Sequence, residues 1–116
     1  MTMPAMMQDS LVRRVDIAAD HPAFAGHFPG RPLLPGVALV AEVLEAALAV
    51  PALAGCIGLS PHLEVVKFLA PVLPGASLLI RFRVTSTALE FVVDDGAHLA
   101  ASGRFSRQAS CGTTTP

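Results

Sequence analysis

Cysteine is scarce in this chain of 116 residues. The two cysteines, Cys56 and Cys111, show neither CxxC spacing nor any paired arrangement. Structural zinc sites and disulfide frameworks both need several cysteines at short, regular spacings. We therefore expect no metal site and no structural disulfide, with one thiol in the core and one in the C-terminal tail of a cytosolic protein.

Charge of either sign is also scarce. Eight Lys and Arg residues against nine Asp and Glu residues leave a net charge of −1, and the basic residues form no run. Such a chain has no positive field to attract phosphates, so nucleic-acid binding is excluded as the expected function. Residues 1–10 lack a basic segment followed by an apolar one, which predicts no export signal and a cytoplasmic location.

No hydrophobic run is continuous enough to cross a membrane. Residues 33–59 contain only two charges, Glu42 and Glu45, but prolines and glycines interrupt them. The uninterrupted helical part is about fourteen residues long, whereas a span needs about twenty. Each acidic residue near the middle of a span would oppose insertion by roughly 2 to 3 kcal/mol. We expect no transmembrane helix.

Hydrophobic periodicity predicts an α+β domain. Alternation of apolar and polar residues, or runs that are apolar on both faces, predicts strands at 11–18, 62–72, 77–85, 88–94 and 97–106. Asp95-Gly96 predicts a two-residue type I′ turn between the last two. Twelve of the fourteen residues from Val37 to Val50 are apolar, which predicts a buried helix over 36–49 that ends at Pro51. The Gly- and Ala-rich residues after Pro51 predict a loose segment.

These elements form one domain, residues 11–107, between an N-terminal extension (1–10) and a disordered tail (108–116). The expected architecture is a single domain in which a curled antiparallel sheet wraps around one long buried helix. So small a sheet does not cover a helix that is apolar nearly all round. A second subunit is the simplest cover, so we expect a dimer.

A proline-rich loop precedes the helix and carries His27. Prolines 22, 29, 32 and 35 restrict their own backbone and that of the preceding residues, so the loop should be stiff and extended. Its histidine then lies beside the N–H groups of the helix N-terminus. An imidazole that titrates near neutral pH beside free N–H donors is an arrangement suited to acid–base chemistry.

Residues 26–37, GHFPGRPLLPGV, resemble the signature of the hot-dog-fold 3-hydroxyacyl-[acyl-carrier-protein] dehydratases of fatty-acid synthesis. Residues 67–75, KFLAPVLPG, resemble the second segment of that family, and the resemblance extends over about 16–107. Within that family, the sequence looks like the short members from aryl-polyene and related lipid pathways. The resemblance implies a hot-dog fold, an acyl carrier protein as partner, and a homodimer or a pseudo-symmetric hot-dog partner. It also implies no bound cofactor, because the substrate is carried on a phosphopantetheine arm.

The resemblance further implies dehydration of a 3-hydroxyacyl thioester to the 2-enoyl thioester. His27 would be the base, and the N–H of Gly36 would donate to the thioester oxygen. The family's acid lies fourteen residues after the histidine and acts across the dimer interface, but here that position is Ala41. Glu45 lies one helical turn further on the same face and can lean back toward the space beside Ala41, so we predict that it replaces the acid. In the alternative reading, Glu45 lies at a wet interface edge without a role.

Other side chains receive supporting roles. Arg31 is the expected contact for an acidic carrier protein, and His21 is expected to order the loop. The substrate contacts are expected from Phe28, Pro35, Val37 and Val40. Two other functions remain open: a hot-dog thioesterase that activates water, and a catalytically weakened hot-dog subunit that only binds the acyl carrier.

Overall fold

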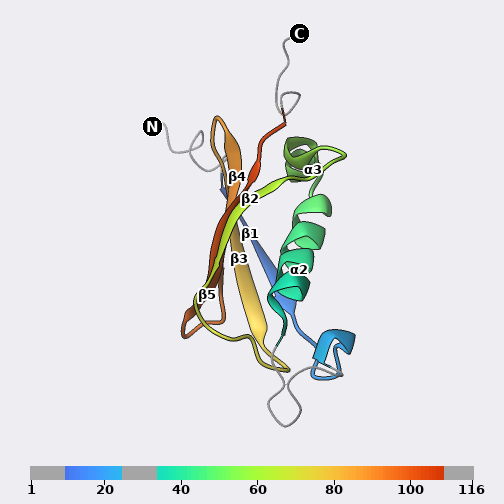
Figure 1. The fold of residues 1–116 in the computed structure, drawn as a ribbon, viewed down its shortest axis with the longest axis vertical. Helices are drawn as coiled ribbons and strands as arrows, with labels where there is room; N and C mark the ends of the chain where they lie inside the picture. The colour runs from blue at the N-terminus through green and yellow to red at the C-terminus, as the bar shows by residue number, and fades with distance from the viewer. Residues whose placement is uncertain (1–9, 25–33, 109–116) are drawn as a thin grey trace.

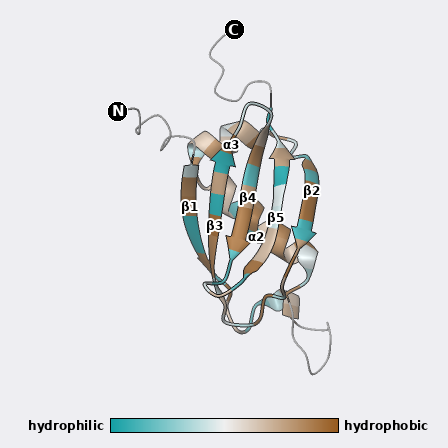
Figure 2. Ribbon diagram, turned by 90° about the vertical axis from the view of Figure 1, so that its left-hand side faces the viewer, coloured by the Kyte–Doolittle hydropathy of each residue, from teal (hydrophilic) through white to brown (hydrophobic). Residues whose placement is uncertain are grey.

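A computed structural model of the protein describes residues 10–24 and 34–108. Five strands form one antiparallel sheet in the order β1-β3-β4-β5-β2, and the helices lie on one of its faces (Figure 1). Strands β1 and β2 are the two edges of the sheet (Figure 2). The elements are β1 (Ser10–Asp16), the 3₁₀ helix η1 (Pro22–Phe24), α2 (Gly36–Leu48), α3 (Pro51–Ile57), β2 (Leu63–Phe68), β3 (Ser77–Val84), β4 (Ala88–Asp94) and β5 (Leu99–Ser106). The predicted α+β architecture is confirmed.

The core lies between the sheet and α2. Along β3 and β4, every second side chain turns toward the helix and is buried. Phe82, Phe91 and Phe105 come from three neighbouring strands and are at most 2% exposed. The rings of Phe91 and Phe105 pack with their centroids 5.5 Å apart. Large buried aromatic side chains of this kind contribute much of a small domain's hydrophobic stabilisation.

Helix α2 buries one face and leaves the other exposed. Leu39, Val43 and Ala46 recur at intervals of three and four residues and are buried against the sheet. The opposite stripe consists of Val37, Ala41, Glu45 and Leu48, all exposed, with Val37 at 81%. A single sheet covers only one face of a helix, so nothing in the described part of the chain covers this stripe. In the described ranges, the helices fall short of the length and hydrophobicity needed to cross a bilayer.

The segment after α2 is helical, which corrects the expectation of a loose connection. Pro51 ends the path of α2 and also begins α3 at its first position. A proline fits there because its fixed φ suits the first helical turn, where its missing N–H would have no partner in the helix. Leu53, Cys56 and Ile57 of α3 are buried.

The β4–β5 turn is centred one residue later than Asp95-Gly96. The N–H of Asp95 donates to the carbonyl of His98 (3.0 Å), so Gly96 and Ala97 are the central residues. Gly96 has a φ of 95°, which a glycine adopts without strain. The carboxylate of Asp95 accepts from the N–H groups of Ala97 (2.9 Å) and His98 (2.7 Å). Asp95 therefore acts as the capping residue before the turn centre, a role that the dipeptide alone does not reveal.

Glu64 adds side-chain hydrogen bonds between edge strand β2 and its neighbour β5. The register shifts between Leu63 and Val65, and Glu64 lies at this irregularity. Its carboxylate accepts from the hydroxyl of Ser106 and from Nε of Arg104 (2.7 Å). The Ser106 hydrogen bond, followed by that of Arg104, lowers the pKa of Glu64 below its ordinary value.

We predict that Glu64→Gln makes the acid destabilisation of the domain less steep. A carboxyl group whose pKa is lower in the folded state stabilises the fold above its unfolded pKa, and that stabilisation disappears as the pH falls through the folded pKa. The measurement is the free energy of unfolding by urea between about pH 6 and pH 3, a window around the ordinary glutamate pKa. Ser106→Ala should flatten the same curve in part. Identical slopes for the wild type and both variants would contradict the role of this pair.

Candidate functional site

The predicted site residues fall into two groups. His27, Phe28 and Arg31 lie outside the described residues. Gly36, Pro35, Val37, Val40 and Glu45 are described, in or next to α2. The described part of the site consists of α2 and the strands that pack against it.

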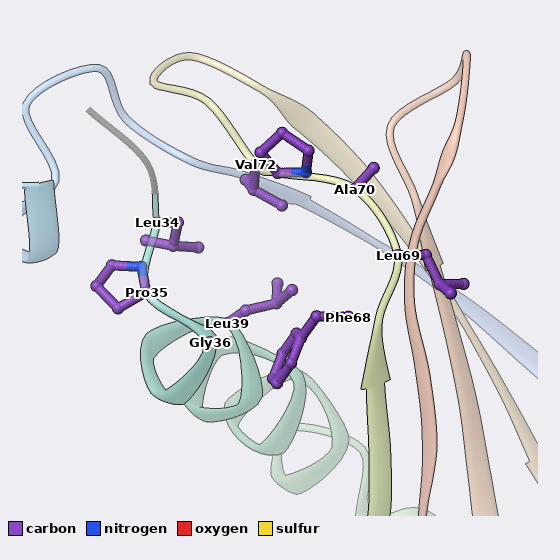
Figure 3. Close-up of a pocket in the computed structure, with 9 residues that line it drawn as sticks. Leu34, Pro35, Gly36, Leu39, Phe68, Leu69, Ala70 and Val72 are labelled. Atoms are coloured by element: carbon purple, nitrogen blue, oxygen red, sulfur yellow. The ribbon is translucent and has the colours of Figure 1, made fainter. Parts of the chain in front are cut away.

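A pocket of about 480 Å³ lies at the N-terminus of α2 (Figure 3). One wall is the beginning of the helix, and the other is the end of β2 with the chain that follows it. The predicted strand over 62–72 ends at Phe68, and the next residues bend along the pocket. The lining is apolar and consists of Leu34, Pro35, Gly36, Leu39, Phe68, Leu69, Ala70, Pro71 and Val72.

Backbone hydrogen bonds hold both walls in place. The N–H of Leu34 donates to the carbonyl of Val72 at 2.9 Å, which joins the entry of α2 to the β2–β3 connection. The N–H groups of Leu69 (2.8 Å) and Ala70 (3.3 Å) donate to the carbonyl of Ala100 on β5. A pocket fixed by main-chain bonds at both ends is largely pre-formed, as small-molecule sites usually are.

The N-terminus of α2 carries no side-chain cap. Pro35 is the N-cap residue, with an extended backbone (φ −60°, ψ 148°), and it has no side-chain acceptor. Its carbonyl accepts from Ala38 and Leu39, both at 3.0 Å, as the first turn requires. Within the described residues, the Gly36 N–H has no acceptor. Such N–H groups at a helix N-terminus, together with the helix dipole, favour a developing negative charge.

Phe68 reaches across the pocket to Gly36, and the sequence assigned it no role. A Cβ built on Gly36 would lie 2.7 Å from Cζ of Phe68 and 2.9 Å from its Cε2. The tip of the ring thus contacts the bare Cα of the glycine (Figure 3). Glycine is required here for this close approach. The only sequence signal was that Phe68 lies in the segment 67–75.

Glu45 is not part of this pocket in one chain. It follows Gly36 by nine residues, a distance of about 13 Å along a helix at 1.5 Å per residue. It is exposed on the stripe with Ala41 and Val37, on the face of α2 that the sheet does not cover. Of the expected substrate contacts on α2, Pro35 lines the pocket, whereas Val37 and Val40 do not.

The other glutamate of α2, Glu42, is paired with His21. Nε2 of His21 lies 2.9 Å from Oε2 of Glu42, and both side chains are 22% exposed. The N–H of Ala23 donates to Nδ1 of His21 (3.0 Å), so the ring proton is on Nε2 and is donated to the carboxylate. The pair fastens η1 to α2, in agreement with the predicted loop-ordering role of His21.

Cys56 corrects the expectation of a free core thiol, because it is disulfide-bonded. Its partner lies outside the described residues. The chain after β5 returns to α3, where the N–H of Gln108 donates to the Cys56 carbonyl at 2.9 Å. This proximity arises from the packing of distant segments, so cysteine spacing could not reveal it. Within the described ranges, no group of three His, Cys, Asp or Glu side chains has an arrangement suited to a metal ion.

A five-stranded antiparallel sheet packed on one long helix, with an apolar pocket at the helix N-terminus, defines the hot-dog fold. Comparison with known proteins is consistent with this class and narrows it. The family model of the ApeI dehydratases matches residues 5–104, and the chain belongs to this ApeI-like family.

Solved structures of similar shape include the dehydratase heterocomplex ApeI:P from Xenorhabdus doucetiae, at 28% identity and a TM-score of 0.69 over 86% of this chain and 88% of that one. An uncharacterised protein from Erwinia carotovora has 31% identity and a TM-score of 0.63, covering 85% of this chain and 82% of that one. An acyl-CoA hydrolase from Staphylococcus aureus, at 22% identity and a TM-score of 0.56, covers 88% of this chain and 63% of its own and shares the fold alone.

Among curated proteins, the 3-hydroxyacyl-[acyl-carrier-protein] dehydratase FabZ of Desulforamulus reducens is 37% identical over 73 residues, which is 60% of this chain and 51% of the relative. FabZ of Symbiobacterium thermophilum is 32% identical over 92 residues, 76% of this chain and 63% of the relative. The chain spans about half to two thirds of the length of the curated relatives it matches.

We predict that Gly36→Ala destabilises the domain by about 1 to 3 kcal/mol, because the new methyl group displaces the Phe68 ring. In a Phe68→Ala background the same substitution should cost almost nothing, since contacting residues are energetically coupled. Denaturant unfolding of the four proteins measures this cycle. Gly55→Ala is the control: its Cβ would meet nothing within 4 Å, and alanine should stabilise α3 by about 0.5 to 1 kcal/mol. If Gly36→Ala lowers the free energy of unfolding equally in both backgrounds, Gly36 and Phe68 are not in contact.

Proposed function

We propose that the protein dehydrates a 3-hydroxyacyl thioester carried on the phosphopantetheine arm of an acyl carrier protein. The observation that carries the proposal is the uncapped N–H of Gly36, a residue that lines an apolar pocket, in a chain of the ApeI-like dehydratase family. The apolar lining suits an acyl chain. A preorganised N–H in a dry pocket stabilises the charge that develops on a thioester oxygen.

In the proposed reaction, His27 removes a proton from C2 while the thioester oxygen accepts a hydrogen bond from the Gly36 N–H. The electron pair of the broken C2–H bond forms the C2–C3 double bond. The C3 hydroxyl leaves with a proton from an acid, so the products are the 2-enoyl thioester and water. A base positioned in this way contributes roughly 10²- to 10⁴-fold to the rate.

Glu45 is the proposed acid, and it acts on the pocket of a second subunit. The exposed stripe on α2 supports this arrangement, because it presents Glu45 and the small Ala41 on a face that nothing in the described part of the chain covers. The pairing of Glu42 with His21 leaves Glu45 as the carboxylate of α2 with no ion-pair partner among the described residues. The X. doucetiae ApeI:P structure is a dehydratase heterocomplex, which supports a second hot-dog subunit, identical or not. Arg31 is the proposed contact for the acidic carrier protein.

Incubation with a 3-hydroxyacyl carrier thioester, followed by mass spectrometry, tests the proposal. The expected product is the 2-enoyl carrier, lighter by one water. Free carrier thiol would instead indicate the thioesterase reading, which the fold shared with an acyl-CoA hydrolase keeps as the second candidate. Unchanged substrate that nevertheless binds would indicate a weakened carrier-binding subunit.

We predict that His27→Ala lowers the rate of dehydration by about 10²-fold or more and leaves the fold intact. A loop histidine supplies the base but contributes little buried area to the core. Initial rates of enoyl formation measure the loss, and circular dichroism confirms folding. His62→Ala is the control, because His62 is an exposed histidine before β2 that does not line the pocket. A wild-type rate for His27→Ala would remove the assignment.

We predict that Glu45→Gln also loses activity and that Ala41→Glu in that background restores part of it. A second experiment mixes the His27→Ala and Glu45→Gln variants and lets their subunits exchange. It tests whether the partner subunit is a second copy of this chain or a different protein. If the site is shared by two copies, hybrid dimers contain one intact site, and the mixture should recover about a quarter of the wild-type rate. Full activity of Glu45→Gln would rule out Glu45 as the acid. No recovery on mixing, although each variant retains its dimeric mass in sedimentation, would rule out a shared site between two copies.

A further inference from the structure

Phe68 takes no part in the proposed chemistry, yet the tip of its ring lies against Gly36, the residue of the proposed oxyanion donor. We infer that Phe68 is a specificity-determining residue that sets the width of the acyl site beside Gly36 and selects thioesters without a branch at C2. This inference rests on the proposed function, because it concerns the substrate of that site. It assigns to a single side chain the discrimination between acyl groups.

Phe68 is placed differently from the aromatic residues of the core. Its side chain is on the helix-facing side of β2, and the residue is 50% exposed, whereas Phe82, Phe91 and Phe105 are at most 2% exposed. A core ring is fixed by neighbours on all sides, whereas Phe68 keeps half of its surface exposed. The tip of its ring meets Gly36. Phe68 therefore contributes shape to the pocket more than burial to the core.

The other parts of the pocket have little freedom to widen. The Leu34–Val72 hydrogen bond ties the entry of α2 to the β2–β3 connection, and the bonds from Leu69 and Ala70 to the carbonyl of Ala100 fix the chain directly after Phe68. Figure 3 shows the ring between this chain and the first turn of α2, directed toward Leu39 and Gly36. Because the backbone on both sides is held, the side chain at position 68 decides how much space remains beside the Gly36 N–H.

The size of that space matters most near C2 of the substrate. A carbonyl oxygen that accepts from the Gly36 N–H at about 2.9 Å brings the thioester carbon and C2 next to the first turn of the helix. The ring tip is already 2.7 Å from the point where a Cβ of Gly36 would lie, so the ring occupies the β2 side of Gly36. A methyl group on C2 would have to displace the ring. One methyl group in a hydrophobic pocket changes kcat/KM by roughly 10- to 200-fold.

The test compares two substrates, the pantetheine thioesters of 3-hydroxybutyrate and 3-hydroxy-2-methylbutyrate. Both retain a proton on C2, so the same elimination is possible for each. The measured quantity is the ratio of kcat/KM for the branched substrate to kcat/KM for the unbranched one. Short thioesters separate the pocket from carrier docking.

We predict that Phe68→Leu raises this ratio by about tenfold or more and that Phe68→Trp lowers it further below the wild-type value. Val65→Ala is the matched control, since Val65 lies on the same edge strand but on the opposite face of the sheet, away from this pocket. It should leave the ratio unchanged. Thermal unfolding of each variant confirms that the proteins compared are folded.

The outcomes separate the inference from the proposed function. Dehydration of the unbranched substrate by the wild type, with the same ratio in the wild type, Phe68→Leu and Phe68→Trp, overturns the inference and leaves the function standing. If the Phe68 variants lose activity equally on both substrates and their subunits dissociate in sedimentation, the inference is also overturned. Phe68 would then be an interface residue. Failure of the wild type to dehydrate either pantetheine substrate or a carrier-linked one overturns the proposed function itself.

Discussion

The packing of one face of α2 against the antiparallel sheet is the interaction on which the rest of the structure depends. Leu39, Val43 and Ala46 meet the aromatic core, and this burial sets the position of the helix along and across the strands. With the helix fixed, its N-terminus falls beside the end of β2. The pocket is a direct consequence of where α2 begins relative to that edge strand.

Rigidity at this point follows from the backbone. The entry to α2 and the connection after β2 are hydrogen-bonded to neighbouring segments, so the N–H of Gly36 is held in a defined direction before any substrate arrives. Preorganised donors stabilise a transition state without the reorganisation that water would require. The absence of a side chain at Gly36 has two effects: it exposes the N–H, and it admits the ring of Phe68.

The same helix divides the proposed chemistry between two faces. Its N-terminus offers a donor inside an apolar pocket, whereas its carboxylates lie elsewhere. Glu42 is engaged by His21 on one flank, and Glu45 is exposed on the stripe that faces away from the sheet. A helix cannot bring residues nine positions apart to one substrate atom. Glu45 is therefore proposed to act on the pocket of a second subunit rather than on that of its own chain.

Local patterns in the sequence determined the elements and the family. Alternation predicted the strands, the apolar run predicted α2 to within one residue, and residues 26–37 and 67–75 predicted the hot-dog dehydratase family. These features depend on neighbours a few positions apart, which a sequence displays directly.

Only the tertiary structure decided the contacts that shape the site. The Phe68 ring against Gly36, the His21–Glu42 pair and the return of the chain to Cys56 join residues that are 21 to 52 positions apart. Such contacts depend on how α2 settles on the sheet, and no periodicity encodes that. Pro51 is a further case: locally it predicts only the end of a helix, and the packing of Leu53 and Ile57 into the core makes it also the start of α3.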